Sequence, residues 1–459
     1  MALRPGPAGD RVTAVTAPPA LRDTLCIEWG ACPPGCRDCV EACALARGVA
    51  RVTALDLAEV SFHGALTCGQ CGEPACRDAC PTGAIVREES GVVRLDQERC
   101  VGCGACAGAC AWGGITLDAV TGRASKCDTC GGRPACALAC TTGRLRWVET
   151  SALARRLGHP DPFTQGVSLC PGCAAELGFR TAFRAIGPDA VVFAAPGCAC
   201  MLACGLGTAA TTRLPSVMSL MTNVPSLMTG VARQLRRSGA RTRAVAFVGD
   251  GTTADVGFQP LSGAAERGEP IVYICYDNEG YMNTGAQRSS TTLQGARTMT
   301  TPVGPGQAGK RQVPKDVAVL MAMHGAAYVA TASVSHPEDF AAKLERALAA
   351  EDGLAYIHLY APCHVGWQAP MDAAVEIARM AVLTRVFPLW EARRGRFRLT
   401  HPIAHPRPLG DFAGLMGRLR HLDEDGLRAL GRAVEERYRR VEALCAALPW
   451  QEPGAAGGR

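Results

Sequence analysis

The sequence predicts an α/β protein in which a domain built on a parallel sheet follows a loop-rich, cysteine-rich domain. The first observation is the distribution of cysteine, because 17 of the 25 cysteines lie between Cys26 and Cys140. The second is a series of five short apolar runs separated by stretches of helix length: AVVFAAPG, AVAFVGDG, IVYICYDN, AAYVATA and LAYIHLYAPC. This alternation is typical of βαβ units, so we expect buried parallel strands in the second half.

Composition is that of a globular protein, with 48% hydrophobic and 20% charged residues. No apolar run approaches the roughly 18 residues of a membrane span, and the first twenty residues contain no secretory apolar core. We therefore expect a cytoplasmic protein. In a reducing compartment, tightly clustered cysteines indicate metal or cluster ligation rather than disulfides.

The sequence divides into five predicted segments. Cysteine density falls after residue 148, and the stretch that follows is punctuated by Pro and Gly, as linkers are. We predict an N-terminal tail over residues 1–20, a ferredoxin-like domain over 21–148, a linker over 149–165, a parallel-sheet domain over 166–371, and a helical C-terminal extension over 372–459 that packs on a neighbour.

Two types of cysteine motif alternate in the first domain. One type is CPPGCRDCVEAC and CVGCGACAGAC, and the other is CGQCGEPACRDAC and CDTCGGRPACALAC. Zinc sites usually take four ligands from two CxxC or CxxH pairs. Three closely spaced cysteines followed by a fourth that serves another cluster are instead the bacterial ferredoxin pattern. The spacing therefore favours 4Fe-4S clusters over zinc.

This region resembles the four-cluster electron-transfer subunits that accompany dimethyl sulfoxide reductase and formate dehydrogenase. The resemblance implies that the first and fourth motifs exchange their last cysteines, and that the second and third do the same. The implied ligand sets are Cys32, Cys36, Cys39 and Cys140; Cys127, Cys130, Cys136 and Cys43; Cys68, Cys71, Cys76 and Cys110; and Cys100, Cys103, Cys106 and Cys80. The gap after Cys32 is one residue longer than in CxxC, so Cys26 remains an alternative ligand.

Polar or thiol residues directly follow the predicted strand in four of the five apolar runs. They are Cys198, Asp250, Asn278 and Cys363. Because ligands of parallel sheets bind outside the carboxyl ends of the strands, we expect these four side chains to share one edge of the sheet.

Asp250 lies in Gly-Asp-Gly, which alone is a weak signal because many solvated turns contain it. The stretch YDNEGYMNTGAQRS, residues 276–289, strengthens it, since the two together resemble the thiamine diphosphate motif. Mg²⁺ prefers oxygen ligands and keeps substrate phosphates in its shell. The resemblance implies Mg²⁺ ligation by Asp250, Asn278 and the Gly280 carbonyl. The implied cofactor-binding residues are Gly249, Asp250, Gly251, Asn278, Gly280 and Tyr281.

The strings NEGYMNTGAQRSSTT, KDVAVLMAMHGAAYVATA and APCHVGW resemble the β subunit of 2-oxoacid:ferredoxin oxidoreductases, the pyruvate synthase group, over about residues 165–445. This resemblance implies oxidative decarboxylation of a 2-oxo acid, with Asn283 and Thr284 as catalytic residues. It also implies a proximal 4Fe-4S cluster, the fifth in the chain, held by Cys170, Cys173, Cys198 and Cys363. Cys200 and Cys204 are more simply packed thiols.

The resemblance further implies a multi-subunit enzyme. An α-type subunit would supply the pyrimidine-binding domain, a γ-type subunit is a further candidate, coenzyme A is the expected acyl acceptor, and ferredoxin or an NAD-linked flavoprotein would take the electrons. The formal charge of +6 could suggest nucleic-acid binding. Five clusters with their thiolates, each about −2, change it to roughly −4, so we expect no nucleic-acid partner. The Arg-rich stretch RQLRRSGARTR is most simply a solvated helix end.

Two other functions share some of these features. A non-oxidative thiamine diphosphate decarboxylase would share Asp250 and Asn278 but would not need the four proximal cysteines. An electron-transfer subunit without catalysis of its own would use the clusters but not the Gly-Asp-Gly site. The sequence does not decide which 2-oxo acid is the substrate.

Overall fold

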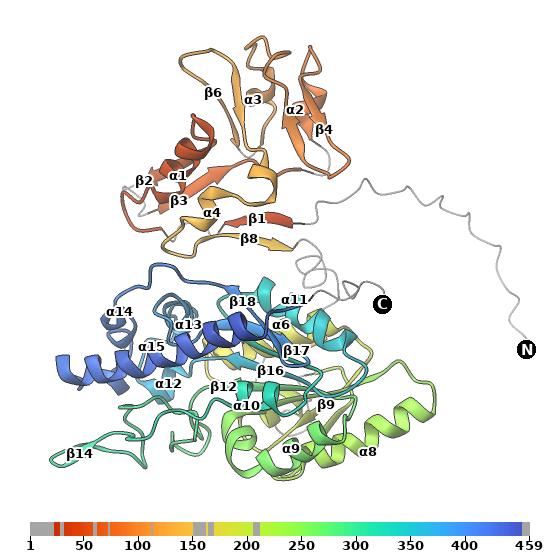
Figure 1. Cartoon of the computed structure of the whole chain (residues 1–459), viewed down its shortest axis with the longest axis vertical. Helices are drawn as coiled ribbons and strands as arrows, with labels where there is room; N and C mark the ends of the chain where they lie inside the picture. The colour runs from red at the N-terminus through yellow and green to blue at the C-terminus, as the bar shows by residue number, and fades with distance from the viewer. Residues whose placement is uncertain are drawn as a thin grey trace, which may run out of the picture. The chain divides into compact units, whose positions relative to one another are not determined.

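The computed structural model describes residues 23–27, 32–57, 62–71, 74–111, 113–149, 162–163, 169–204 and 212–451. The chain divides into two compact units, Met1–Thr150 and Ser151–Arg459 (Figure 1). The expected tail, residues 1–20, and most of the expected linker, residues 149–165, lie outside the described residues. Among the helices that are described, none combines the length and the apolar character needed to cross a membrane.

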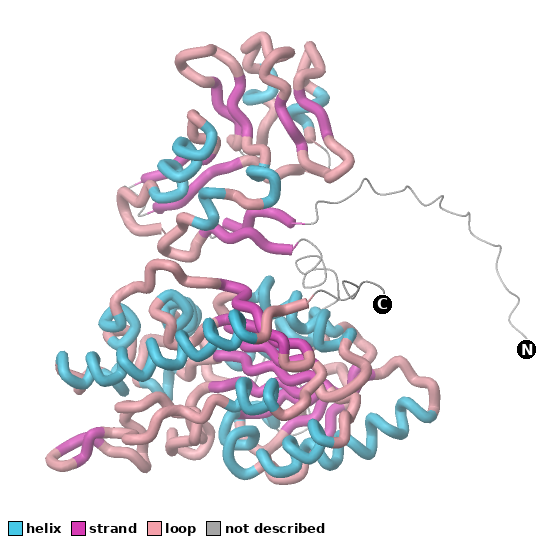
Figure 2. The backbone as a smooth tube through the Cα atoms, in the orientation of Figure 1, coloured by secondary structure: helices cyan, strands magenta, loops and turns pink. Residues whose placement is uncertain are grey.

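The first unit consists of short antiparallel strand pairs joined by loops and short helices (Figure 2). The pairs are β1 (Asp23–Ile27) with β8 (Leu145–Glu149), β2 (Val52–Leu57) with β3 (Phe62–Thr67), β4 (Ile85–Arg87) with β5 (Val93–Leu95), and β6 (Ile115–Leu117) with β7 (Ala124–Lys126). The helical elements are α1 (Asp38–Arg47), α2 (Ala75–Asp78), α3 (Ala105–Gly108), η2 (Thr129–Gly132) and α4 (Ala135–Leu138). Each of α1 to α4 carries the third cysteine of one motif, so the short helices position thiols.

The described part of the second unit is built around an eight-stranded sheet in the order β10-β9-β11-β12-β16-β15-β17-β18. The strands are β9 (Ala190–Ala194), β10 (Ser216–Met218), β11 (Arg243–Gly249), β12 (Val272–Asp277), β15 (Tyr328–Ser333), β16 (Ala355–Tyr360), β17 (Leu389–Arg393) and β18 (Arg396–His401). The strands from β10 to β15 in that order are parallel, and β17 and β18 continue the sheet antiparallel. The predicted α/β fold with a parallel sheet is confirmed, and each of the five apolar runs overlaps a strand.

Helices cover both faces of this sheet (Figures 1 and 2). One core includes residues of α6 (Ala174–Ile186), α7 (Cys198–Ala203), α11 (Pro337–Ala349) and α13 (Ala374–Leu383). The other includes residues of α8 (Val224–Arg237), α9 (Phe258–Glu266) and α10 (Val317–Met323). Strand residues alternate between the two cores: Val245 and Phe247 face the first, whereas Ala246 and Val248 face the second. This burial on both sides explains why the strands are apolar throughout.

The expected helical extension, residues 372–459, needs correction. Between α13 and the later helices α14 (Leu409–Ala413), η4 (Gly417–Leu419) and α15 (Glu424–Ala447), the chain forms β17 and β18. Trp390 and Phe397 are buried on these strands and contact each other, so packing on the existing sheet makes this segment a hairpin. Helix α15 buries Leu430, Val434, Tyr438 and Val441 within its own unit, and packing of this segment on a neighbour stays a prediction.

Candidate active site and iron–sulfur sites

The carboxyl ends of four adjacent parallel strands carry the predicted site residues of the second unit. Strands β9, β11, β12 and β16 are hydrogen-bonded in that order, each parallel to the next. Cys198, Asp250, Asn278 and Cys363 follow these strands in the same order. The four residues therefore lie at one edge of the sheet, as the apolar runs predicted.

Three oxygen atoms meet in the loops after β11 and β12. One end of the Asn278 amide lies 2.9 Å from the Gly280 carbonyl oxygen and 3.0 Å from Asp250 Oδ1. With its nitrogen there, the amide donates a hydrogen bond to each; with its oxygen there, three oxygens face one another, as they would around a cation. Octahedral Mg²⁺ with bonds of about 2.0–2.1 Å spaces neighbouring ligand oxygens about 2.9 Å apart. The two distances match edges of such an octahedron, so these residues fit a magnesium ion.

The loop that carries Asp250 is held by Tyr281. After Asp250 the chain forms a π-helical turn, η3 (Gly251–Val256), a conformation that is frequent at functional sites. The Tyr281 hydroxyl lies 3.1 Å from the Gly251 carbonyl oxygen and 3.1 Å from Asp255 Oδ2. A Cβ atom at Gly251 would come within 2.5 Å of the Tyr281 ring. Glycine is therefore required for this close approach.

Asp250 belongs to a buried hydrogen-bond network with Thr291, Asp277 and His358. Thr291 Oγ1 donates toward Asp250 Oδ2 and Asp277 Oδ1, at 2.9 Å each, and His358 Nε2 lies 2.8 Å from Asp277 Oδ2. Burial, followed by the charge of Asp277, raises the pKa of Asp250 well above its usual value. Burial also acts to raise the pKa of Asp277, but the hydrogen bond and charge of His358 outweigh it and lower that pKa. A cation beside Asp250 would relieve this repulsion.

The predicted proximal cysteines form a thiol cluster near the same edge. Burial raises the pKa of Cys198 to about 12, and the neighbouring thiols of Cys173, Cys363 and Cys170 add to the shift. Gly172 makes the tight turn of this CPGC loop, with a φ of +78° and a Cβ position 2.0 Å from the Met371 carbonyl oxygen. Cys363 Sγ accepts a hydrogen bond from Gly366 N at 3.3 Å. Thiols with raised pKa values release protons when they bind iron.

Two cavities in the first unit are lined by four thiols each. One is lined by Cys32, Cys36, Cys39 and Cys140, with Thr142 and Arg144 beside them. The other is lined by Cys80, Cys100, Cys103 and Cys106. These are two of the four implied ligand sets, and in each the last cysteine of one motif joins three of another. Cys26 is not among the lining residues; it lies on β1, with Arg146 Nη2 4.0 Å from its sulfur.

In the first unit, the four thiols of one remaining set are neighbours, as are Cys68, Cys76 and Cys110 of the other. Burial, followed by the thiols of Cys127, Cys43 and Cys130, raises the pKa of Cys136 to about 12. Burial raises the pKa of Cys76. The charge of Lys126 opposes this shift, whereas the thiols of Cys68 and Cys110 add to it. Backbone amides donate to several sulfurs, which is one way proteins tune iron–sulfur clusters. Such bonds are Arg51 N to Cys43, Ala84 N to Cys80, and Leu145 N to Cys140, at 3.2–3.3 Å.

Four other sequence-selected residues lie apart from these groups. Asn283 and Thr284 are exposed in the loop after Tyr281, and the Thr284 hydroxyl is engaged within its turn, 2.5 Å from Gln287 Oε1. Cys200 Sγ lies 3.0 Å from the Met218 sulfur. Cys204 has Cys200 as its neighbouring thiol, and burial raises its pKa. Cys200 therefore contacts both Cys204 and Met218.

Sequence reasoning missed Asp277, Thr291 and His358. Each has its partner far along the chain, so no local spacing could reveal the pairing. One signal was present: His358 and Asp277 are polar residues within otherwise apolar strands, and buried polar groups require partners.

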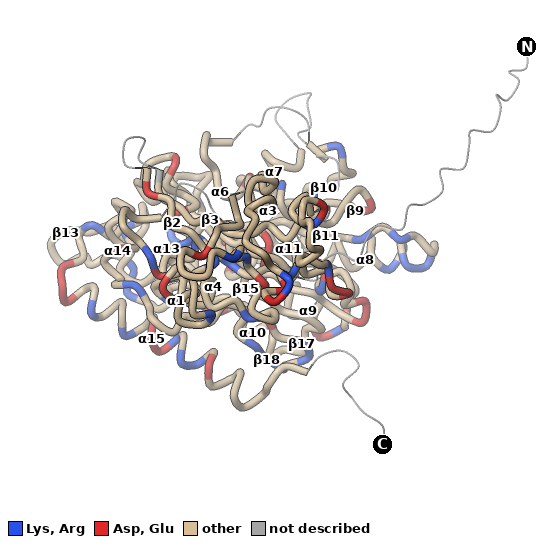
Figure 3. Tube along the Cα trace, turned by 90° about the horizontal axis from the view of Figure 1, so that it is seen from above, with Lys and Arg blue, Asp and Glu red and all other residues tan. Residues whose placement is uncertain are grey.

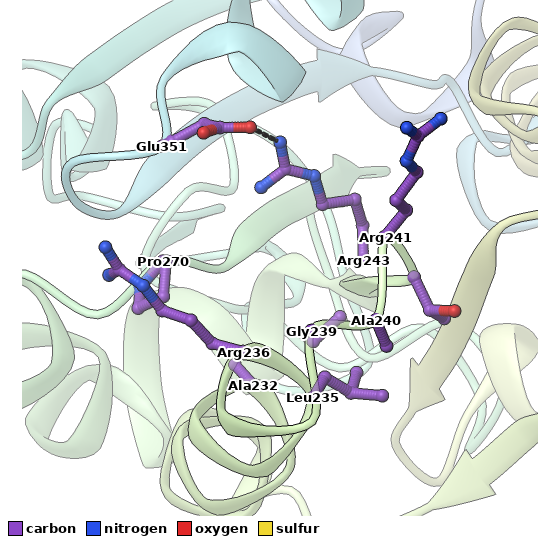
Figure 4. Close-up of a pocket in the computed structure, with 11 residues that line it drawn as sticks. Ala232, Leu235, Arg236, Gly239, Ala240, Arg241, Arg243, Pro270 and Glu351 are labelled. Atoms are coloured by element: carbon purple, nitrogen blue, oxygen red, sulfur yellow. Dashed lines mark hydrogen bonds and ion pairs between the residues drawn. The ribbon is translucent and has the colours of Figure 1, made fainter.

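A basic cavity occurs at the opposite end of β11. It has a volume of about 440 Å³ and is lined by Arg236, Arg241, Arg243 and Glu351 among others (Figure 4). Arg243, the first residue of β11, pairs with Glu351. Lys and Arg positions gather along α8 in Figure 3. None of the predicted site residues lines this cavity, so it is separate from the candidate active site.

Two family models match the chain. Residues 195–359 match the thiamine pyrophosphate enzyme, C-terminal TPP binding domain, and residues 60–150 match the 4Fe-4S dicluster domain. The fold and the sites therefore define a thiamine diphosphate-binding protein with an attached iron–sulfur domain.

Relatives of the chain narrow this class. The β subunit of NADH-dependent phenylglyoxylate dehydrogenase from Aromatoleum evansii is 41% identical over 424 residues, 89% of this chain and 95% of that subunit. Pyruvate synthase subunit PorB from Methanothermobacter thermautotrophicus is 42% identical over 56% of this chain and 88% of its own length. Ketoisovalerate oxidoreductase subunit VorB from Pyrococcus horikoshii is 37% identical over 61% of this chain and 93% of its own length. The chain belongs to the family of β subunits of 2-oxoacid oxidoreductases, as the sequence motifs predicted, and this family decarboxylates 2-oxo acids oxidatively.

Proposed function

We propose that this chain is the β-type subunit of a 2-oxoacid oxidoreductase that binds thiamine diphosphate through Mg²⁺ and passes electrons through one proximal and four further 4Fe-4S clusters. One observation carries the proposal: the Asp250, Asn278 and Gly280 group and the group of four thiols both lie at the same edge of the sheet. A non-oxidative decarboxylase does not need the thiols, and an electron carrier does not need the oxygens.

The residues of the two loops have distinct roles in this proposal. Thiamine diphosphate, when bound, supplies the electron sink that decarboxylation requires. Asp250, Asn278 and the Gly280 carbonyl would hold the Mg²⁺ that binds its diphosphate. Gly249 and Gly251 let the backbone approach closely, while Tyr281 keeps the Gly251 turn in place. Asn283 and Thr284, exposed beside this loop, are proposed to contact the substrate.

The thiol sets are proposed to form the route by which electrons leave. Cys170, Cys173, Cys198 and Cys363 would hold the proximal cluster, which takes up one electron at a time. The four sets of the first unit would relay these electrons to an external acceptor, either ferredoxin or an NAD-linked flavoprotein. All 25 cysteines, each among the described residues, are free of disulfides. This supports a reducing, cytoplasmic location.

Activity is proposed to require an α-type subunit and to use coenzyme A as the acyl acceptor. The family model for thiamine binding matches a single segment of the chain, so the pyrimidine-binding part would come from the partner. A γ-type subunit is a further candidate for the complex. The names of the relatives describe subunits, which agrees with this arrangement.

Phenylglyoxylate is the substrate that we propose to test first. The Aromatoleum evansii subunit matches 89% of this chain, whereas the pyruvate synthase subunit matches 56%. A match of that extent includes the cysteine-rich unit as well as the thiamine-binding unit. The same relative supports an NAD-linked acceptor, since its name describes it as NADH-dependent.

The test is anaerobic purification of the chain with its partner subunits, followed by cofactor analysis and a substrate panel with a viologen acceptor. We expect thiamine diphosphate, Mg²⁺ and about 20 iron atoms per chain. We also expect viologen reduction with one of phenylglyoxylate, pyruvate, 2-oxoglutarate, ketoisovalerate or indolepyruvate. Decarboxylation without viologen reduction would favour the non-oxidative function. Iron without thiamine diphosphate would favour the electron-carrier function.

A further inference from the structure

Arg418 is a buried arginine in η4 for which the proposed function supplies no role. Its side chain is 2% exposed, and its Nη2 donates to Glu279 Oε2 at 2.7 Å. The guanidinium carbon lies 3.4 Å from the centroid of the Trp367 ring, so the cation lies directly over the aromatic face. Nε and Nη1 are buried without a hydrogen-bond partner among the described residues.

Both partners of Arg418 belong to the loops of the candidate active site. Glu279 stands between Asn278 and Gly280, two of the proposed Mg²⁺ ligands. Trp367 ends α12 (His364–Trp367), the helix that follows Cys363, and its Nε1 donates to the Asn278 carbonyl oxygen at 2.8 Å. Arg418 therefore lies where the cysteine loop after β16 meets the oxygen-ligand loop after β12.

Glu279 is held firmly in this junction. Its backbone has a φ of +59°, in the left-handed region that a residue with a side chain seldom adopts. Its carboxylate accepts hydrogen bonds from Tyr360 Oη at 3.0 Å and Leu293 N at 2.9 Å, besides the Arg418 ion pair. These contacts fix the backbone on both sides of Glu279, which carries the Asn278 and Gly280 oxygens.

The charge of Arg418 also lies close to Cys363. The guanidinium is stacked on the Trp367 ring, and the Trp367 backbone N–H donates to the Cys363 carbonyl oxygen at 2.9 Å. A buried fixed charge is weakly screened by solvent. It would therefore act on any negative group that Cys363 binds.

We propose that Arg418 is a positioning residue that joins the Cys363 loop to the Asn278 loop and raises the reduction potential of the cluster held by Cys170, Cys173, Cys198 and Cys363. The inference rests on the proposed function, because it requires that cluster. Reduction adds one electron to the cluster and transfers no atom, so the reduced form is one charge more negative. A nearby cation stabilises the reduced form more than the oxidised form, and charge near a cluster is one of the factors that set its potential.

The test compares Arg418→Met, Arg418→Lys and Glu279→Gln in the holo-complex. The readout is the midpoint potential of the proximal cluster in an EPR-monitored redox titration, where the signal absent from Cys198→Ala identifies that cluster. We expect Arg418→Met to lower the equilibrium constant for reduction by about tenfold. Arg418→Lys keeps the charge and should keep most of the potential. Glu279→Gln leaves the arginine charge unopposed and should raise the potential.

The opposite signs distinguish a charge effect from a loss of structure. Arg418→Met and Glu279→Gln break the same ion pair, so a merely structural role predicts shifts in the same direction. Equal potentials in all variants, or shifts of the same sign, would overturn the inference while leaving the proposed function intact. If Cys198→Ala loses no EPR signal, the proposed function itself fails. If Arg418→Met does not fold, Arg418→Lys and Glu279→Gln still decide the question.

Discussion

The two units of this chain differ in what their cores are made of. In the second unit, two apolar cores cover the faces of an eight-stranded sheet within the described residues. In the first unit, two small cores include several of the proposed cluster ligands, among them Cys43, Cys76, Cys106 and Cys136. Two of its strand pairs have strands of only three residues. Short strands and small cores contribute little stability alone.

This difference teaches that iron–sulfur ligation and catalysis place different demands on structure. The first unit holds its thiols with loops and short helices, so its order should depend on the clusters it binds. The second unit builds two apolar cores from its own side chains, and its proposed ligands follow the strands at one edge of the sheet. Each of the following predictions tests this contrast, from the largest expected effect to the smallest.

Anaerobic removal of iron with a chelator should unfold the first unit and spare the second. Without clusters, residues 23–149 lose the bonds that join their motifs, whereas the strands of the large sheet keep their packing. Hydrogen-exchange mass spectrometry should show near-complete loss of amide protection in β4 to β7 and retained protection in β11, β12 and β16. Retained protection in both units would contradict the contrast.

Asp250→Ala should abolish cofactor retention without changing the fold of either unit. It removes the only carboxylate among the proposed Mg²⁺ ligands, so thiamine diphosphate should bind about 100-fold more weakly or worse. Thiamine content after desalting and total iron are the measurements. Asp352→Ala, at a surface pair with Arg394, is the matched control and should leave both unchanged. Normal thiamine content in Asp250→Ala would refute the ligand assignment.

Cys198→Ala should remove about one-fifth of the iron, since one cluster of five is lost. Cys200→Ala, two residues away in α7, is the control and should lose none. Both variants should keep thiamine diphosphate, because its proposed ligands lie on other loops. Iron loss in Cys200→Ala but not in Cys198→Ala would move the ligand assignment to Cys200.

Tyr281→Phe should have the smallest effect. It removes the hydroxyl contacts to the Gly251 carbonyl and Asp255, which corresponds to about 1 kcal/mol. We expect several-fold weaker thiamine diphosphate binding and an unchanged iron content. Titration of the desalted complex with the cofactor checks this. Unchanged affinity would show that the Gly251 turn keeps its shape without Tyr281.

The sequence was most informative where function depends on order along the chain. The apolar runs matched strands, and residues directly after them reached one edge because parallel strands all point the same way. The nested cysteine sets were implied by a family resemblance, and two of the four sets line cavities in the first unit; the ligand assignment itself stays a prediction.

Features that depend on packing between distant segments were not predictable. The segment that forms β17 and β18 was expected to be helical. It forms strands because β17 pairs with β15 of the large sheet, and a single sequence does not show this pairing. His358 contacts Asp277, 81 positions away in the sequence, and Arg418 contacts Glu279, 139 positions away. Such partners are set by the three-dimensional arrangement, and a single sequence carries no local record of them.

The nested arrangement of the proposed ligand sets in the first unit also determines the order in which they become complete during synthesis. The set of Cys80, Cys100, Cys103 and Cys106 is complete once residue 106 has left the ribosome, and the set ending in Cys110 follows soon after. Cys43 must wait for Cys136, and Cys32 must wait for Cys140, after which β8 can pair with β1. Under the proposed ligand sets, assembly on a nascent chain would therefore proceed from the inner pair of sites to the outer pair, and the earliest of these cysteines to be synthesised would be the last to gain all of their partners.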